Sequence, residues 1–157
     1  MEHLTYILAL LAEAYGKGGQ VEEGLAAVAE ALELVDRTGE RYYEAELYRL
    51  KGTLTLQSQT SLGQVSDKSM TSQSTTAVEK EAEACFLKAI EIAQRQQAKS
   101  LELRASTSLA RLWQKQGKKD EARQMLAEIY GWVTEGFDTK DLQEAKALLE
   151  ELEESHS

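Results

Sequence analysis

The residue types that could do chemistry are few in this chain and lie far apart. Two histidines, His3 and His156, stand at opposite ends, where chains tend to fray, and no His-Glu-x-x-His spacing or similar metal-ligand pattern occurs. The single cysteine, Cys85, is followed by Phe86 and has no histidine near it in the sequence that could activate a thiolate. We interpret Cys85 as a buried, inert thiol, and we predict no metal site.

Two other patterns are superficially similar to reactive sites. Gly16-Lys17-Gly18-Gly19 has the residue types of a phosphate-binding loop, but it follows a helical pattern instead of a strand and lacks the Gly-x-x-x-x-Gly-Lys-Ser/Thr spacing. The clustered carboxylates near the C-terminus are typical of a solvated helix face: Glu150, Glu151, Glu153 and Glu154. The sequence therefore predicts no catalytic residues and no cofactor, and a protein that is not an enzyme.

Composition and charge restrict the class of protein. The chain has 157 residues, of which 42% are hydrophobic and 29% charged, as expected of one globular domain of ordinary size. Its net charge of −9 argues against general binding to nucleic acid or anionic lipid, because both require a basic face. No run approaches the ~18 apolar residues of a membrane span, the first residues lack a signal-peptide pattern, and one cysteine excludes an internal disulfide. We expect a soluble, cytoplasmic protein.

The spacing of apolar residues is helical throughout. Leu4, Leu8, Leu11 and Tyr15 share one helix face, and no segment alternates with a period of two over a useful length. With no proline and ten glycines, glycine supplies the breaks between helices. The sequence predicts an all-α fold, with helices at about 2–16, 20–37, 40–57, 77–97, 99–116, 119–133 and 138–154.

Residues 58–76 interrupt this rhythm with a polar run rich in Ser, Thr and Gln. Such a run has little to bury, and closing a long loop costs only slightly more than closing a short one. We interpret it as a mobile insertion that lengthens the turn between the third and fourth helices. The alternative is a loop that phosphorylation or a partner orders.

A helix-hairpin pattern returns three times with a period of about 40 residues, as in solenoids of stacked hairpins. The recurring residues are Leu8, Leu11, Ala12, Tyr15, Gly19, Val28 and Ala31, then Ala82, Phe86 and Ala89, then Leu109, Ala110, Trp113, Gly117, Ala122 and Leu126. At these positions the chain resembles the tetratricopeptide repeat (TPR) family, in which small residues let helices approach and large ones fill the space beside them. It departs from the family at Gly24 and Ile129, which replace alanines, in having no terminal proline, and in repeats longer than the usual ~34 residues.

The resemblance implies a TPR-like α-hairpin solenoid that forms a single domain over residues 1–157. Its hairpins would span about 2–37, 40–97 (with the polar insertion 58–76) and 99–133, followed by a capping helix at 138–154. That last helix has an apolar stripe backed by glutamates, as a solenoid end requires: Leu142, Ala145, Leu149 and Leu152.

A narrower resemblance covers nearly the whole chain outside the insertion. Segments 10–16, 44–52, 98–105 and 130–139 are similar to the C-terminal TPR region of large bacterial signalling proteins. Those proteins join a cyclase or transcription-regulator domain to an AAA-like (STAND-type) ATPase and then to the repeat tail. The resemblance implies a non-catalytic protein–protein interaction or regulatory module in signal transduction, because nothing in this chain matches a cyclase or an ATPase.

In TPR stacks the first helix of each hairpin lines a concave groove. The resemblance places six residues of this chain there: Tyr6, Glu13, Tyr48, Arg104, Arg111 and Lys115. The last three share one helix face, and arginine binds carboxylates in a bidentate way, so this stripe favours an acidic peptide or protein partner. The alternative is that these charges pair with neighbouring glutamates such as Glu102 and Glu121.

The first predicted helix carries apolar residues that point in more than one direction: Leu4, Tyr6, Ile7, Leu8, Leu10 and Leu11. This surface would pack on a missing repeat, on a second copy of the chain or on a partner, unless the second hairpin covers it. Two non-enzymatic functions therefore remain: an interaction module, and a structural role in which the apolar N-terminal hairpin drives formation of a homo-oligomer.

Overall fold

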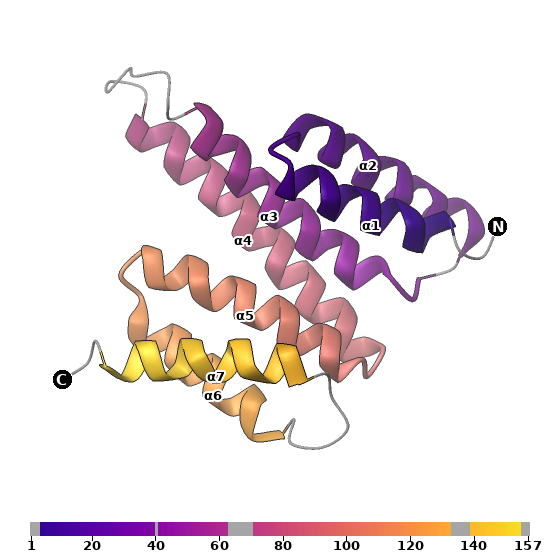
Figure 1. Ribbon diagram of the computed structural model, residues 1–157. Helices are drawn as coiled ribbons and strands as arrows, with labels where there is room; N and C mark the ends of the chain where they lie inside the picture. The colour runs from indigo at the N-terminus through magenta and orange to yellow at the C-terminus, as the bar shows by residue number, and fades with distance from the viewer. Residues whose placement is uncertain (1–3, 40, 63–70, 133–138, 155–157) are drawn as a thin grey trace. The chain divides into compact units, whose positions relative to one another are not determined.

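The computed structural model describes residues 4–39, 41–62, 71–132 and 139–154, and all the regular structure in these ranges is helical (Figure 1). The helices are α1 (Leu4–Lys17), α2 (Val21–Thr38), α3 (Glu44–Leu62), α4 (Thr71–Arg95), α5 (Lys99–Lys115), α6 (Lys119–Trp132) and α7 (Thr139–Glu154). The prediction of an all-α fold is confirmed. Within the described ranges, no helix combines the length and apolarity that crossing a bilayer requires.

Three turns between helices close in the same way. Gly19, Gln97 and Gly117 have left-handed backbones, with φ of 79°, 55° and 81°. In each turn the next amide donates to the carbonyl five residues earlier: Gln20 to Tyr15 (2.8 Å), Ala98 to Ala93 (2.9 Å) and Lys118 to Trp113 (2.8 Å). This Schellman arrangement satisfies carbonyls at the helix ends. Two of the three turns have the glycine that favours a positive φ, and the third uses glutamine.

The predicted bounds of the non-helical insertion, 58–76, are wrong at both ends. α3 continues to Leu62 and α4 begins at Thr71, so 58–62 and 71–76 are helical, whereas 63–70 lie outside the described residues. A helix that has formed gains one backbone hydrogen bond for each residue added, and no proline or glycine follows Gly52 until Gly63. Polar hydroxyls also bond back to the helix, as when Ser58 donates to the Thr55 carbonyl at 2.7 Å. Polar composition alone therefore does not end α3.

The chain divides into two compact units, Met1–Ala89 and Ile90–Ser157, and the boundary falls within α4. The single domain over 1–157 stays a prediction. In the first unit α1 packs on α2, and α3 packs on both. Their core consists of Leu8, Ala9, Ala12, Val21, Ala27, Val28, Ala31, Val35, Leu47, Leu50 and Leu54.

Small residues let the helices of the first unit approach closely. A Cβ atom on Gly24 would lie 3.2 Å from the Ala12 carbonyl oxygen and 3.1 Å from Cδ1 of Leu54. A Cβ on Gly52 of α3 would lie 2.7 Å from Cε1 of Phe86 on α4. The aromatic ring of Phe86 therefore rests directly against the α3 backbone.

The second unit repeats this plan with different helices. α5 packs on α6, and α7 packs on both. The buried residues of this core are Leu103, Ala110, Ala122, Leu126, Ile129, Ala145, Leu148 and Leu152. Leu142 and Leu149 of the predicted apolar stripe are partly buried against it. At the start of α5 Glu102 is only 3% exposed, and its carboxylate accepts a hydrogen bond from Gln94 Nε2 at 3.0 Å.

Candidate functional site

The predicted groove residues divide between the two units. Tyr6, Glu13 and Tyr48 belong to the first unit, and Arg104, Arg111 and Lys115 belong to the second. Tyr6 is 42% exposed, and its ring centroid lies 5.4 Å from that of Tyr43. The exposed Glu13 carboxylate lies 3.5 Å from the ammonium of Lys17, one helical turn further on. The α1 side of the predicted groove is therefore aromatic and close to neutral.

Tyr48 is half-buried on α3. Burial raises the pKa of its phenol, and the negative charges of Glu44 and Asp36 raise that pKa further. Asp36 is on α2, where it lines a pocket together with Lys51 and Thr55 of α3. Residues three and seven positions apart share a helix face, so Tyr48 belongs to the face of α3 that borders this pocket.

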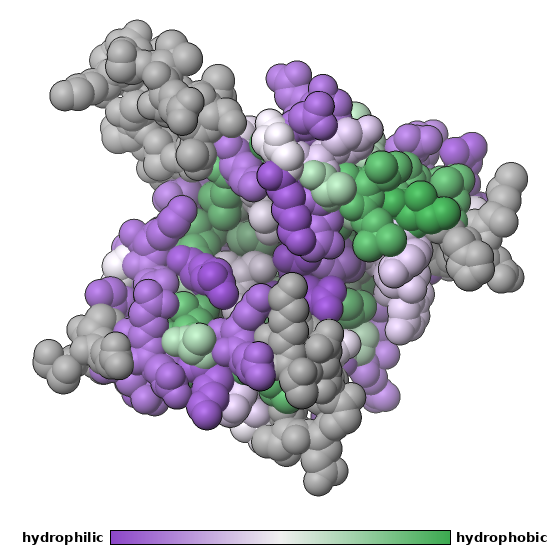
Figure 2. Space-filling model, in the orientation of Figure 1, coloured by the Kyte–Doolittle hydropathy of each residue, from purple (hydrophilic) through white to green (hydrophobic). Residues whose placement is uncertain are grey.

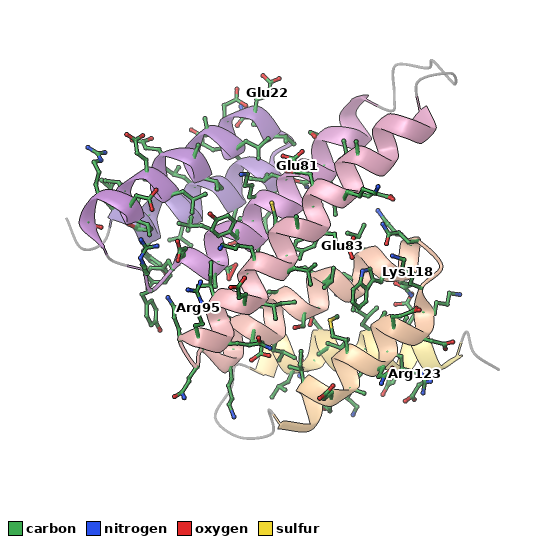
Figure 3. The ribbon with its side chains drawn as sticks, turned by 180° about the vertical axis from the view of Figure 1, so that it is seen from behind. Glu22, Glu81, Glu83, Arg95, Lys118 and Arg123 are labelled. Atoms are coloured by element: carbon green, nitrogen blue, oxygen red, sulfur yellow. The ribbon has the colours of Figure 1, made fainter. Side chains whose placement is uncertain are left out.

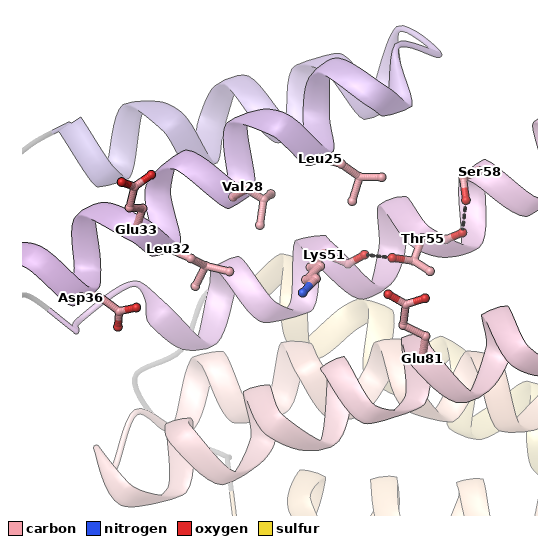
Figure 4. A pocket seen from close by; sticks show the side chains of 10 residues that line it. Leu25, Val28, Leu32, Glu33, Asp36, Lys51, Thr55, Ser58 and Glu81 are labelled. Carbon is pink, nitrogen blue, oxygen red and sulfur yellow. Dashed lines mark hydrogen bonds between the residues drawn. The ribbon is translucent and has the colours of Figure 1, made fainter.

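The pocket has a volume of about 620 Å³ and is bounded by α2, α3 and α4 (Figure 4). Apolar side chains from α2 form one wall: Leu25, Val28, Ala29 and Leu32. The polar lining comes from all three helices: Glu33, Asp36, Lys51, Thr55, Ser58 and Glu81. The volume is typical of sites that bind small molecules or inserted side chains. With one cation and three carboxylates, the pocket can accept an amphipathic group that carries positive charge.

Cys85, the cysteine of α4, is a free thiol. Cys85 is 7% exposed, so the interpretation of a buried thiol is confirmed. Burial raises the pKa of this thiol, and the nearby positive charge of Lys51 lowers it by a smaller amount. Because the thiolate is the nucleophilic form, we expect this raised pKa to lower the reactivity of Cys85 at neutral pH. In the part of the chain that the structure describes, no three or more His, Cys, Asp or Glu residues form a group that could hold a metal ion.

The basic residues of α5 differ in exposure. Arg111 and Lys115 are exposed, whereas Arg104 is half-buried. Thr107, one helical turn after Arg104, is 6% exposed, and its hydroxyl donates to the Leu103 carbonyl at 2.8 Å. Two of the three predicted cations are thus directly accessible to a partner, and they lie on consecutive turns of one helix.

Sequence patterns alone did not indicate the pocket. Lys51, Thr55 and Ser58 are spaced by four and three residues, so their common face on α3 could have been read from the sequence. Glu81 follows the polar run, and no local pattern indicates that α4 brings it beside that face. Only the packing of helices α2, α3 and α4 assembles the site.

Comparisons with known proteins assign neither a family nor a function to this chain. No protein-family model matches the chain, and neither a curated protein nor a solved structure matches it. Its function is therefore inferred from the residues of this chain and their surroundings.

Proposed function

We propose that this chain is a TPR-like, non-catalytic module that binds a segment of a partner protein in the cytoplasm. In each unit a third helix packs on both members of the preceding helix pair, as in stacked hairpins. Gly24 and Gly52 stand where a neighbouring helix leaves little room for a side chain, which is the role of small residues in TPR hairpins. Together with the resemblance noted above, this supports a C-terminal repeat tail of a bacterial signalling ATPase or cyclase, with α7 as its capping helix.

The basic face of α5 carries this proposal. Arg111 and Lys115 are exposed and four residues apart, so they concentrate positive charge on one helix face of a chain with a net charge of −9. Arg104 extends the same face by two further turns. Guanidinium groups bind carboxylates through two parallel hydrogen bonds, and complementary charge also speeds association. We therefore assign an acidic peptide segment as the ligand of this face.

A peptide-binding measurement tests the assignment. The probes are a fluorescein-labelled amphipathic peptide rich in glutamate and the same peptide with lysine at each glutamate, followed by fluorescence anisotropy. We expect the acidic peptide to bind, and Arg111→Glu combined with Lys115→Glu to weaken its binding by about tenfold or more, equivalent to at least ~1.4 kcal/mol.

A matched control separates a local site from net charge. Lys118→Glu with Lys119→Glu makes the same change in charge just after α5, where Lys118 lies in the turn to α6 (Figure 3). This control should bind the acidic peptide nearly as tightly as the original chain does. Equal losses in both variants, or no loss in the α5 variant, would refute the proposed site. Preferential binding of the lysine peptide would instead point to the acidic pocket of the first unit.

A further inference from the structure

Helix α1 has apolar side chains on its outer face as well as on its inner face. Leu8, Ala9 and Ala12 lie in the core. An outer stripe is made of Leu4, Ile7, Leu10, Leu11 and Ala14, and its four large members are exposed by 39%, 48%, 47% and 42%. Figure 2 shows the corresponding hydrophobic surface where α1 lies in Figure 1. A helix that is apolar all round is normally enclosed on all sides.

The equivalent positions of α3 are covered within the first unit. Ala12 of α1 lies against Gly24 of α2, just as Gly52 of α3 lies against Phe86 of α4, so α3 repeats α1 forty residues later. Ile7, Leu10 and Ala14 then correspond to three α3 residues that are 0%, 4% and 2% exposed: Leu47, Leu50 and Leu54. The α1–α2 pair covers these three residues.

Helix α5 shows the same burial pattern. Tyr15 and Gly19 correspond to Trp113 and Gly117, the residues that close the two matching turns. With this alignment, Ile7, Leu11 and Ala14 match three buried residues that are 1%, 0% and 1% exposed: Ala105, Leu109 and Leu112. Ile7, Leu10, Leu11 and Ala14 thus each match an apolar residue that α3 or α5 buries.

We propose that the outer stripe is the interface between two copies of this chain, with α1 packed against α1 about a two-fold axis. The charges of α1 favour this partner, because Glu13 and Lys17 pair with each other and leave the helix neutral. Two copies that each carry a net charge of −9 repel one another, and a neutral apolar face is where they can meet.

The alternative of head-to-tail association through α7 is less favourable. α7 turns Glu144, Lys146, Glu150 and Glu153 to solvent. Packing these residues on the outer stripe would bury charged groups against aliphatic side chains. A two-fold contact avoids this cost because the same apolar surface serves both copies.

The exposed area agrees with an interface of standard size. At ~200 Å² for a large, fully exposed side chain, the exposed parts of the four large stripe residues and Tyr6 sum to about 400 Å². A standard interface buries ~800 Å² on each partner, of which roughly 60% is non-polar. The outer stripe and Tyr6 therefore supply most of the apolar part, and Glu13 and Lys17 lie where a polar rim is needed.

Sedimentation equilibrium over a wide concentration range tests the proposal. We expect the apparent mass to rise from 17.5 kDa towards twice that value. Ile7→Glu with Leu10→Glu should weaken dimerisation by ~100-fold or more, because it places charge inside an apolar contact. Both side chains are about half exposed, so the helical circular dichroism signal should be unchanged.

Leu87→Glu is the matched control, because Leu87 on α4 is 47% exposed, as Leu10 is. This control should dimerise as the original chain does. A monomer at every concentration, a dimer that survives the double substitution, or equal dissociation of the control would each overturn the proposal. Binding of the acidic peptide is measured separately on the monomeric variant, so failure of one proposal does not obscure the other.

Discussion

The contact between Gly52 and Phe86 gives a sharp test of how tightly the first unit is packed. In a helix, alanine is favoured over glycine by about 1 kcal/mol, so Gly52→Ala would stabilise α3 if space were available. The added Cβ would instead lie 2.7 Å from Cε1 of Phe86 and 3.0 Å from its Cδ1 and Cζ. The ring is 1% exposed and cannot swing into solvent. Overpacking of this kind costs about 1–3 kcal/mol.

The net expectation for Gly52→Ala is a loss of about 1 kcal/mol in the free energy of unfolding. For a chain of this size that loss lowers the melting temperature by roughly 2–4 °C. Thermal and urea unfolding followed by circular dichroism would measure both quantities. The same substitution at Gly131 of α6 is the control, because nothing lies within 4 Å of its Cβ position. Gly131→Ala should be neutral or stabilising by up to about 1 kcal/mol.

A second variant separates the ring contact from other effects of Gly52→Ala. In a Phe86→Leu background the ring edge is gone, so Gly52→Ala should lose most of its penalty and show a coupling energy of about 1 kcal/mol. If Gly52→Ala stabilised the chain as much as Gly131→Ala does, the proposed close approach of α3 and α4 would be refuted.

Three further predictions concern single interactions. Gln97→Gly should raise the free energy of unfolding by about 0.5–1 kcal/mol in urea titrations, because a left-handed backbone costs a non-glycine residue about 1–2 kcal/mol; a decrease would contradict the turn geometry. The Cys85 thiol should react with a disulfide reagent more slowly than free cysteine at neutral pH, and Lys51→Met should slow it further, because burial raises the thiol pKa above its usual 9.0 and Lys51 opposes that rise. A Cys85 rate at pH 7 equal to that of free cysteine would contradict the raised pKa. The same shift in pKa favours the folded state below pH 9.0, and this contribution to stability is lost as the pH rises through the folded-state pKa. Arg49→Leu should cost about 1–2 kcal/mol in the same urea assay, because Arg49 Nε donates to Glu46 Oε1 at 2.6 Å and these side chains are only 15% and 10% exposed; adding Glu46→Gln should recover part of the loss, and an unchanged midpoint for Arg49→Leu would count against the pair.

Local periodicity predicted the helices well where apolar residues repeat. Residues 20–37 and 99–116 were expected to be helical, and α2 and α5 cover Val21–Thr38 and Lys99–Lys115. The prediction failed at 58–62 and 71–76, where composition is polar but the helices continue. A left-handed Gln97 could not be foreseen, because glutamine carries no preference for that conformation.

The candidate site was less predictable than the helices. Arg111 and Lys115 are exposed and Arg104 is half-buried, and the groove position of these three residues stays a prediction. The pocket could not be foreseen, because Asp36, Lys51 and Glu81 meet only through packing of three helices. The groove position of Tyr48 was assigned by repeat register alone, and it stays a prediction. The pocket depends on long-range packing, which has no local signature in the sequence.

The order of helix packing has a consequence for how the chain acquires its structure. Among the described residues, each packed pair of helices within a unit is adjacent in sequence or separated by one helix. Short separations between contacting residues lower the entropy lost on closing each loop, and chains of this kind fold within microseconds to milliseconds. We expect α1, α2 and α3 to assemble while the ribosome is still translating α5 to α7, so the apolar face of α1 would be displayed to another nascent chain before synthesis ends.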